Sequence, residues 1–118
     1  MEDHLFDSEM KLMEYLWEIG PLSAKELSLL AGEQHGWNKN TTYTVLTRLV
    51  SKGRVERQDP GFICRPLVSR EEVQRAETKG LLNRFFGGSK KALFSALLED
   101  ESLSQEDWDA LKKMIEDH

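Results

Sequence analysis

The apolar positions of residues 37–53 recur at helical spacing, and the rest of the chain is arranged around this stretch. Four residues follow one another at offsets of four, seven and eight, which places them on one face of a helix: Thr42, Leu46, Leu49 and Val50. Asn38 or Asn40 is suited to cap the start of this helix, and Gly53 is suited to end it. We interpret Trp37, which precedes the helix, as a core anchor rather than a ligand platform.

The opposite face of this predicted helix carries short polar side chains flanked by a tyrosine and an arginine: Asn40, Thr44, Thr47, Ser51, Tyr43 and Arg48. A face that meets only solvent is usually filled with Glu and Lys, as in the other predicted helices of this chain. Short hydroxyl and amide groups let a helix approach a DNA groove closely and reach base edges or phosphate oxygens. The face therefore favours DNA contact, and the alternative is a threonine-rich helix without a partner.

Two further helices are predicted before this one. The first is expected over residues 7–18, with Asp7 or Ser8 as its cap and with a stripe of apolar residues: Met10, Met13, Leu16 and Trp17. The sequence Ser-Ala-Lys-Glu at residues 23–26 has the spacing of a capping box. It opens a second helix that we expect to stop at Gly32, with three residues facing inward: Leu27, Leu30 and Ala31.

After the third helix the pattern changes from helical to extended, which predicts a β-hairpin. A strand around Val55 and a strand over residues 62–65 flank the turn signal Asp59-Pro60-Gly61. Three helices followed by a two-stranded hairpin form a winged helix-turn-helix, with the third helix as recognition helix and the hairpin as wing. Three wing arginines suit phosphate or minor-groove contact, unless they are solvated strand-edge charges that deter aggregation: Arg54, Arg57 and Arg65.

Three short helices are predicted in the remainder of the chain, capped by Ser69, Ser89 and Ser104 and interrupted at Gly87-Gly88. They carry large apolar residues at helical spacing: Leu81, Leu82, Phe85, Phe86, Leu93, Phe94, Leu97, Leu98, Trp108, Leu111, Met114 and Ile115. This surface has to pack onto the winged helix or onto a partner. We favour a homodimer, because the winged helix already has a core of its own.

The predicted fold is therefore mostly α with a small β-hairpin. A winged helix-turn-helix DNA-binding domain occupies residues 1–68, and a three-helix dimerisation domain occupies residues 69–118. A dimer suits DNA binding, because two half-sites held by one connected scaffold multiply the affinity.

Charge is distributed unevenly along the chain. The net charge is −5 at pH 7, but residues 34–70 hold seven cations against two carboxylates, a local net charge of +5. The other 81 residues carry −10. Surface charges are screened within about 10 Å at moderate salt, so the basic middle segment matters more for a DNA partner than the total does.

The sequence offers little for other classes of function. No catalytic constellation or nucleotide-binding motif is suggested, so we expect neither an enzyme nor a cofactor. The single Cys64 excludes an internal disulfide and a cysteine-cluster metal site, and we interpret it as a half-buried strand residue. We interpret the acidic run at residues 99–101 as solvated rather than metal-binding. The chain lacks a signal-peptide pattern at residues 1–4 and an apolar run of roughly 20 residues, so we expect a cytoplasmic protein without stable membrane association.

Several groups of residues match the pattern of one known family: Asp7-Ser8-Glu9 before Met13 and Trp17; Trp37 with Thr41, Thr44, Thr47-Arg48-Leu49 and Lys52-Gly53; residues 82–88, Leu-Asn-Arg-Phe-Phe-Gly-Gly; and Leu103-Ser104. From about Leu5 to its end, the chain resembles the BlaI/MecI family of penicillinase repressors. The resemblance implies a homodimeric winged-helix repressor on a dyad-symmetric operator, with interleaved C-terminal helices. It also implies control of β-lactam resistance genes and inactivation by proteolysis in the C-terminal domain, initiated by a membrane sensor of β-lactam.

We expect the DNA contacts to come from the recognition helix and the wing: Asn38, Lys39, Asn40, Thr42, Tyr43, Thr44, Thr47, Arg48, Lys52, Arg54, Arg57 and Arg65. Members of the family often open this helix with Ser-Pro-Lys, so the Asn-Lys-Asn of this chain predicts a different operator preference. The scissile bond of the family is commonly Asn-Phe, and the aligned candidate for a sensor-linked protease is Ala96-Leu97. Similar copper-responsive repressors carry clustered cysteines near the C-terminus, which Cys64 alone cannot supply.

The second hypothesis is a winged-helix protein-interaction module without specific DNA binding, whose apolar C-terminal helices bind another protein. Such a module would need neither the basic middle segment nor the polar face of the third helix.

Overall fold

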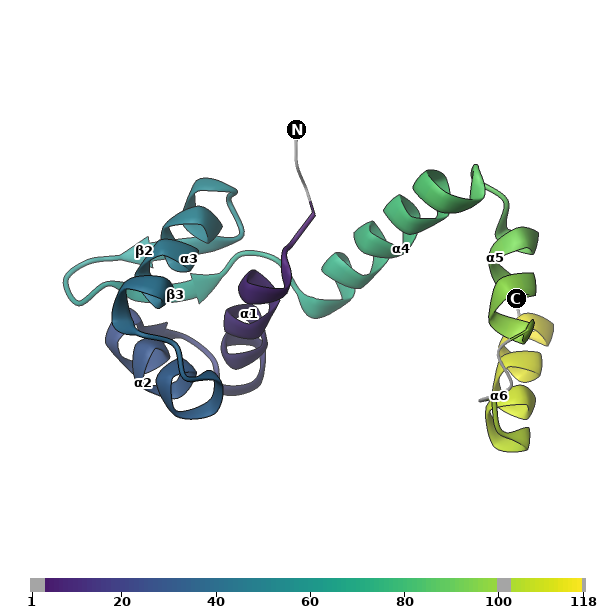
Figure 1. Ribbon diagram of the computed structural model, residues 1–118, viewed down its shortest axis with the longest axis horizontal. Coiled ribbons are helices and arrows are strands. Elements are labelled where there is room, and N and C mark those ends of the chain that lie inside the picture. The colour runs from purple at the N-terminus through teal and green to yellow at the C-terminus, as the bar shows by residue number, and fades with distance from the viewer. Residues whose placement is uncertain (1–3, 100–102, 118) are drawn as a thin grey trace. The chain divides into compact units, whose positions relative to one another are not determined.

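The computed structural model describes residues 4–99 and 103–117, and the chain forms two compact units, Met1–Glu77 and Thr78–His118. The predicted fold class is confirmed: most elements are helices, and the strands form one small antiparallel sheet (Figure 1). In chain order the elements are α1 Asp7–Ile19, β1 Leu22–Ser23, α2 Ala24–His35, α3 Lys39–Ser51, β2 Val55–Gln58, β3 Ile63–Pro66, α4 Arg70–Phe86, α5 Lys90–Glu99 and α6 Gln105–Glu116.

The core of the first unit is formed by α1, α2, α3 and the sheet. Its largest fully buried apolar side chains come from all four: Leu12, Met13, Leu16, Leu27, Leu46, Leu49, Val55 and Cys64. Of the stripe predicted for α1, Met10 and Trp17 are only partly buried. Trp37 is also partly buried and packs against the core, which confirms its interpretation as a core residue.

The start of α1 differs from the prediction, since neither Asp7 nor Ser8 is its cap. The capping residue is Phe6, whose backbone N–H donates to Oε1 of Glu9 at 2.8 Å. An apolar residue can hold this position because the carboxylate three residues later satisfies the N–H that would otherwise lack a partner. Glu9 itself is fully buried, which its place among polar neighbours in the sequence did not predict.

The start of α2 is the predicted capping box. The Glu26 N–H donates to the Ser23 hydroxyl, and the Ser23 N–H donates to the Glu26 carboxylate, each at 3.0 Å. These bonds hold the pKa of Glu26 below its usual value, so the stabilising contribution of its carboxylate is present at neutral pH and is lost as the pH falls through that lowered pKa.

The end of α2 was predicted wrongly at Gly32, since the helix continues to His35 and ends at Gly36. Gly36 adopts the left-handed conformation, with φ of 68°, that ends many helices. A Cβ on Gly32 would lie 3.4 Å from the carbonyl oxygen of Trp37, so this glycine gives the returning chain close access to the helix.

The sheet has the strand order β1-β3-β2 and is antiparallel throughout. The hairpin of β2 and β3 is the predicted wing, whereas the two-residue β1 was not predicted because it is too short to show alternation. Cys64 pairs with Leu22 on one side and Arg57 on the other. It is fully buried rather than half-buried, and burial raises the pKa of its thiol to about 11, so the thiol is neutral and unreactive at pH 7.

The first turns of α4 pack on the first unit. Ser69 and Glu72 form the predicted capping box, with both bonds at 3.0 Å. The Arg70 guanidinium donates to the Glu14 carboxylate at 2.6 Å, and the Leu5 N–H donates to Glu77 at 3.0 Å. The compact units consequently divide after Glu77, later than the domain boundary predicted at 68/69.

The second unit has the predicted helix caps and almost no buried surface. The N–H groups of Ala92 and Asp107 donate to the hydroxyls of Ser89 and Ser104, each at 3.1 Å. Among the described residues of α5 and α6, no side chain is buried. Eight large apolar residues of α4, α5 and α6 are exposed: Leu81, Phe85, Phe94, Leu97, Leu98, Trp108, Met114 and Ile115. Four others of the predicted dimerisation set are intermediate in exposure: Leu82, Phe86, Leu93 and Leu111.

Candidate nucleic-acid interface

The recognition helix α3 begins at the predicted cap. The Asn38 carboxamide oxygen accepts hydrogen bonds from the N–H and the hydroxyl of Thr41, at 2.8 and 3.0 Å. Because this oxygen is used locally, only the NH2 of the Asn38 side chain is left as a donor to a ligand. The helix is followed by Gly53, whose φ of 74° is left-handed, as predicted from its position after Lys52.

The outer face of α3 is exposed at the five predicted polar positions: Asn40, Thr44, Thr47, Arg48 and Ser51. The Thr47 hydroxyl donates to the backbone carbonyl of Tyr43 at 2.8 Å, so its oxygen remains as an acceptor. Arg48 lies 6.0 Å from the ring of Phe6, and its Nη2 is 3.4 Å from the Ser8 hydroxyl. The face therefore presents hydroxyl acceptors, an amide and one guanidinium, which are groups that read base edges in the major groove.

Thr42 was predicted both for the apolar face and for DNA contact, and the structure decides between the two. Its side chain is fully buried, and its hydroxyl makes no hydrogen bond with any described residue. Thr42 follows the apolar periodicity of α3, and this periodicity turns it into the core. Its assignment as a DNA contact is wrong.

The prediction of Lys52 as a DNA contact also needs correction. Its Nζ lies 2.8 Å from Oε1 of Glu9 and 3.0 Å from the carbonyl oxygen of His4, and it lies 4.6 Å from the centre of the Phe6 ring. Only 18% of the side chain is exposed. The charge of Lys52 is therefore directed into the first unit, where it offsets a buried carboxylate, and it is not presented to DNA.

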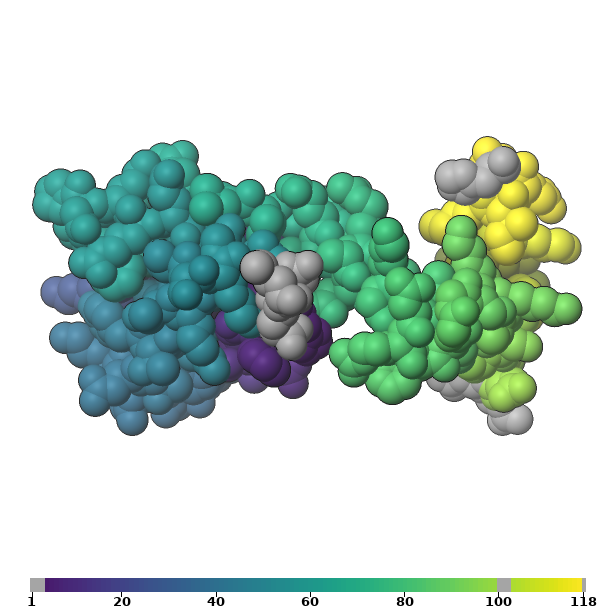
Figure 2. Space-filling view, turned by 90° about the horizontal axis from the view of Figure 1, so that it is seen from above, coloured from purple at the N-terminus to yellow at the C-terminus, as the bar shows by residue number. Residues whose placement is uncertain are grey.

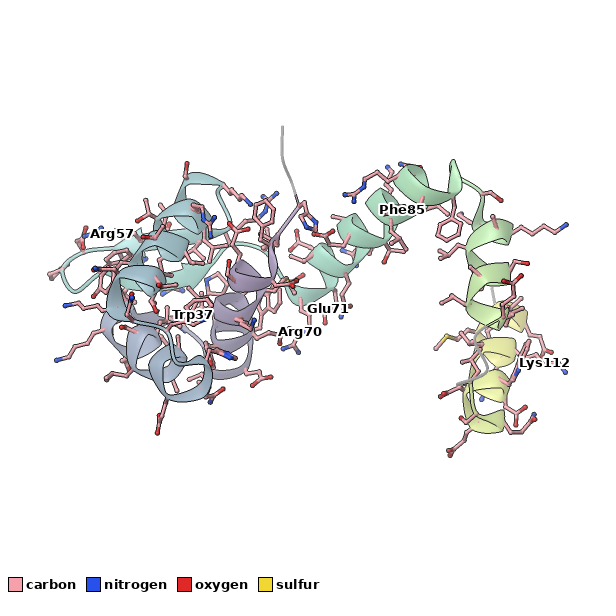
Figure 3. All side chains as sticks on the ribbon, in the orientation of Figure 1. Trp37, Arg57, Arg70, Glu71, Phe85 and Lys112 are labelled. Carbon is pink, nitrogen blue, oxygen red and sulfur yellow. The ribbon has the colours of Figure 1, made fainter. Side chains whose placement is uncertain are left out.

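The wing carries its arginines in different settings. Arg57 and Arg65 are exposed, with carboxylates nearby: Nε of Arg57 is 3.2 Å from Asp59, and Nε of Arg65 is 4.0 Å from Glu56. Figure 2 shows the teal surface of the hairpin at the margin of the first unit, and Figure 3 marks Arg57 on it. Such exposed pairs are weak, so both guanidinium groups are available to a stronger anion such as phosphate.

Arg54 stands at the base of the wing and is half-buried, with Nη1 at 3.4 Å from the carbonyl oxygen of Lys52. It lines a pocket together with residues of the segment that leads into α4 and of α4 itself: Val68, Glu72, Val73, Ala76 and Glu77. The side chain of Arg54 is therefore less exposed than those of Arg57 and Arg65, and its role as a DNA contact stays a prediction.

Two aromatic residues join the wing to α3, and only one of them was predicted as part of the site. Tyr43 is half-buried, and its ring packs edge-on against Phe62 with 5.8 Å between ring centres. Phe62 was taken only as the first residue of a strand. Its place directly after the turn glycine was the one sequence signal for a role at the tip of the wing.

The residues that the structure describes contain no group of three or more His, Cys, Asp or Glu side chains that could hold a metal ion. Of the acidic run interpreted above, Asp100 and Glu101 lie outside the described residues. Within the described part of the chain, no helix is long and apolar enough to cross a membrane.

Comparison with known families identifies the family of the chain. The family described as Penicillinase repressor matches residues 5–117. The chain belongs to the penicillinase repressor family. The match covers both compact units, which confirms the resemblance that the sequence motifs carried.

Individual relatives of this family member are distant but span nearly the whole chain. The penicillinase repressor of Bacillus licheniformis is 25% identical over 114 residues, which cover 95% of this chain and 89% of the relative. The methicillin resistance regulatory protein MecI of Staphylococcus aureus strain N315 is 26% identical over 110 residues, which cover 92% of this chain and 89% of MecI. The solution structure of the DNA-binding domain of the repressor BlaI superimposes with a TM-score of 0.55 at 22% identity, covering 58% of this chain and 87% of that domain. It shows that the first unit has the same fold.

In this penicillinase repressor family member, the candidate cleavage bond Ala96-Leu97 lies within α5, and both side chains are exposed. The residues predicted for the dimer interface all lie on α4, α5 and α6. Figure 3 marks one of them, Phe85, near the end of α4.

Proposed function

We propose that this chain is a cytoplasmic homodimeric transcriptional repressor that binds a dyad-symmetric operator in double-stranded DNA. The observation that carries the proposal is the exposed polar face of α3, which lies on the same compact unit as the basic wing. A recognition helix of this kind enters the major groove, and a dimer places two such helices on half-sites about one helical turn apart.

The names of the relatives support the choice of regulated genes. A penicillinase repressor and a regulator of methicillin resistance both align along most of this chain. We propose accordingly that this protein controls β-lactam resistance genes.

Dimerisation through the second unit is proposed from its exposed apolar residues. Phe85, Met114 and Ile115 are each at least 60% exposed in the single chain. An apolar surface of this kind marks an interaction site. The same exposure favours the second candidate, a protein-interaction module, whose partner would be a different protein. Sedimentation of the purified chain tests the dimer, and a mobility shift on the DNA upstream of its own gene separates a repressor from such a module.

Relief of repression is proposed to follow cleavage at Ala96-Leu97 by a sensor-linked protease. The bond lies inside α5, so the helix has to unwind locally before a protease can bind it in extended form. Intact-mass measurement of the tagged repressor after β-lactam exposure tests this step. A full-length chain released from its operator would point to a different signal.

The outer face of α3 is expected to determine sequence preference. Replacing Thr44 or Arg48 by Ala should change the discrimination between two operators by about 1–3 kcal/mol where a base contact is lost. Titration of each variant against operator and scrambled duplex measures the change. Equal losses on both duplexes would contradict base reading by these residues.

The wing is expected to contribute affinity without sequence preference. Arg65→Ala should weaken binding to operator and scrambled duplex alike and should reduce the salt slope by about 0.9, the value for one phosphate contact. Lys11→Ala is the matched control, because Lys11 is an exposed cation of α1 outside the proposed interface. A salt slope that is unchanged in Arg65→Ala, or reduced equally in Lys11→Ala, would contradict a phosphate contact by the wing.

A further inference from the structure

A row of cations and aromatic rings joins the recognition helix to the wing. The Nζ of Lys39 lies 5.6 Å from the centre of the Tyr43 ring, and the Tyr43 ring meets the Phe62 ring at an interplanar angle of 76°. The guanidinium carbon of Arg57 lies 3.7 Å from the centre of the Phe62 ring. Cation–ring contacts and edge-to-face ring pairs are both attractive. Phe62 therefore stands between the helix and the cation of the wing.

The backbone of Phe62 is unusual. Its φ of 48° is in the left-handed region, directly after Gly61 with φ of 96°. This region is strained for a bulky residue and unstrained for glycine. The Phe62 carbonyl accepts a hydrogen bond from the N–H of Ala24 at 2.9 Å, which ties the turn to the start of α2. A strained backbone position that holds a large ring marks Phe62 as a candidate for a functional role.

The ring also determines where Arg57 points. The Nε of Arg57 is 3.2 Å from each carboxylate oxygen of Asp59, and the guanidinium plane is covered by Phe62 on one side. Its terminal Nη atoms make no hydrogen bond with the residues that the structure describes, and 47% of the side chain is exposed. With its Nε beside a carboxylate and one face against the ring, the guanidinium has its two outer nitrogens left for two-point binding of a phosphate, and the ring contact supplements the weak exposed ion pair in orienting them.

We propose that Phe62 is a positioning residue for DNA binding. It fixes the Arg57 guanidinium relative to Tyr43 on α3. The phosphate contact of the wing and the base contacts of the helix can then form at the same time on one duplex. The inference rests on the proposed function and adds to it the residue that couples the two contact surfaces. No direct contact between Phe62 and DNA is needed.

The first test is made on the unmodified protein without DNA. The relaxation of the side-chain Nε–H of Arg57 is measured by NMR, with Arg65 as the matched control on the same wing. Arg65 lies 4.0 Å from its carboxylate partner, and no aromatic ring among the described residues is in cation–ring contact with it. The Arg57 Nε–H should be as ordered as the backbone, and the Arg65 Nε–H should be mobile. Equal mobility of the two side chains would overturn the proposal.

The second test is a double-mutant cycle on a duplex that the wild-type protein enriches from a random-sequence pool. Arg57→Lys keeps the charge but loses the planar contact with the ring, and Phe62→Leu keeps an apolar side chain but loses the ring face. Each change should lower the affinity by about two- to thirtyfold, the range of a cation–ring contact, and the double variant should lose no more than one of them. Phe62→Tyr keeps the ring and should restore affinity to within about twofold.

The outcomes separate the inference from the proposed function. Losses that multiply in the double variant, or an Arg57→Lys affinity equal to that of the wild type, overturn the role of Phe62 and leave DNA binding intact. Failure of the wild-type protein to enrich any duplex refutes the proposed function itself. Thermal unfolding of Phe62→Leu shows whether its fold is retained. If it is not, the NMR comparison and Arg57→Lys alone decide the question.

Discussion

A chain that ends at Ala96 is expected to be monomeric and to bind its operator about 10²–10⁴-fold more weakly than the full chain. The truncation removes six large apolar residues of the proposed dimer interface: Leu97, Leu98, Trp108, Leu111, Met114 and Ile115. Full burial of each such side chain contributes at most roughly 1.5–3 kcal/mol, so their joint loss removes a large part of the energy available for dimerisation. Light scattering and operator titration measure the two effects.

The loss of affinity should come from lost avidity rather than from damage to the DNA-binding unit. The first compact unit ends at Glu77, and its core lies within residues 5–73, so it should remain folded in the truncated chain. On a duplex that contains a single half-site, the truncated and full chains should bind equally. A truncated chain that still dimerises and binds the operator tightly would contradict the role assigned to the second unit.

Lys52→Ala is expected to destabilise the first unit by about 3–5 kcal/mol, the cost of leaving a buried charge unpaired. The Glu9 side chain is fully buried, and Lys52 is the cation paired with it at 2.8 Å. The second carboxylate oxygen of Glu9 has no hydrogen-bond partner among the described residues, so the ion pair carries most of the compensation for burying this charge.

Denaturant unfolding followed by tryptophan fluorescence measures this effect, since Trp17 and Trp37 both pack against the core. Lys11→Ala removes an exposed cation and should change the free energy of unfolding by less than about 0.5 kcal/mol. In the Lys52→Ala background, Glu9→Gln should recover part of the loss, because it removes the charge while keeping an oxygen for the N–H of Phe6. A change for Lys52→Ala no larger than that for Lys11→Ala would mean that Glu9 finds another partner.

Sequence patterns predicted those features of the fold that depend on residues close together in the sequence. The capping boxes at Ser23 and Ser69 and the caps at Asn38, Ser89 and Ser104 all satisfy N–H groups within three residues, so local spacing reveals them. The predicted end of α2 at Gly32 was wrong, because a glycine often ends a helix and Gly32 is the first glycine in this one. The helix continues past Gly32 because it ends at the next glycine, Gly36, whose left-handed φ of 68° turns the chain.

Parts of the candidate site depend on contacts that no local pattern contains. Lys52 was expected on the DNA surface because it follows a polar helix, yet it pairs with Glu9, which lies 43 residues earlier in the chain. Thr42 was ambiguous because its hydroxyl suits a DNA surface and its position suits the core. Phe62 gains its place beside Tyr43 only when the hairpin folds back toward α3. In each case a second element decides where the side chain points.

The most direct test of the central claim is a comparison of two duplexes under one salt condition. Fluorescence anisotropy of the full chain is measured on the duplex enriched from a random-sequence pool and on a scrambled duplex of the same length and composition. A sequence-specific dimeric repressor should prefer the enriched duplex by about 10³-fold or more, with two chains bound to each duplex molecule. Equal affinity for the two duplexes would contradict sequence-specific repression by this protein.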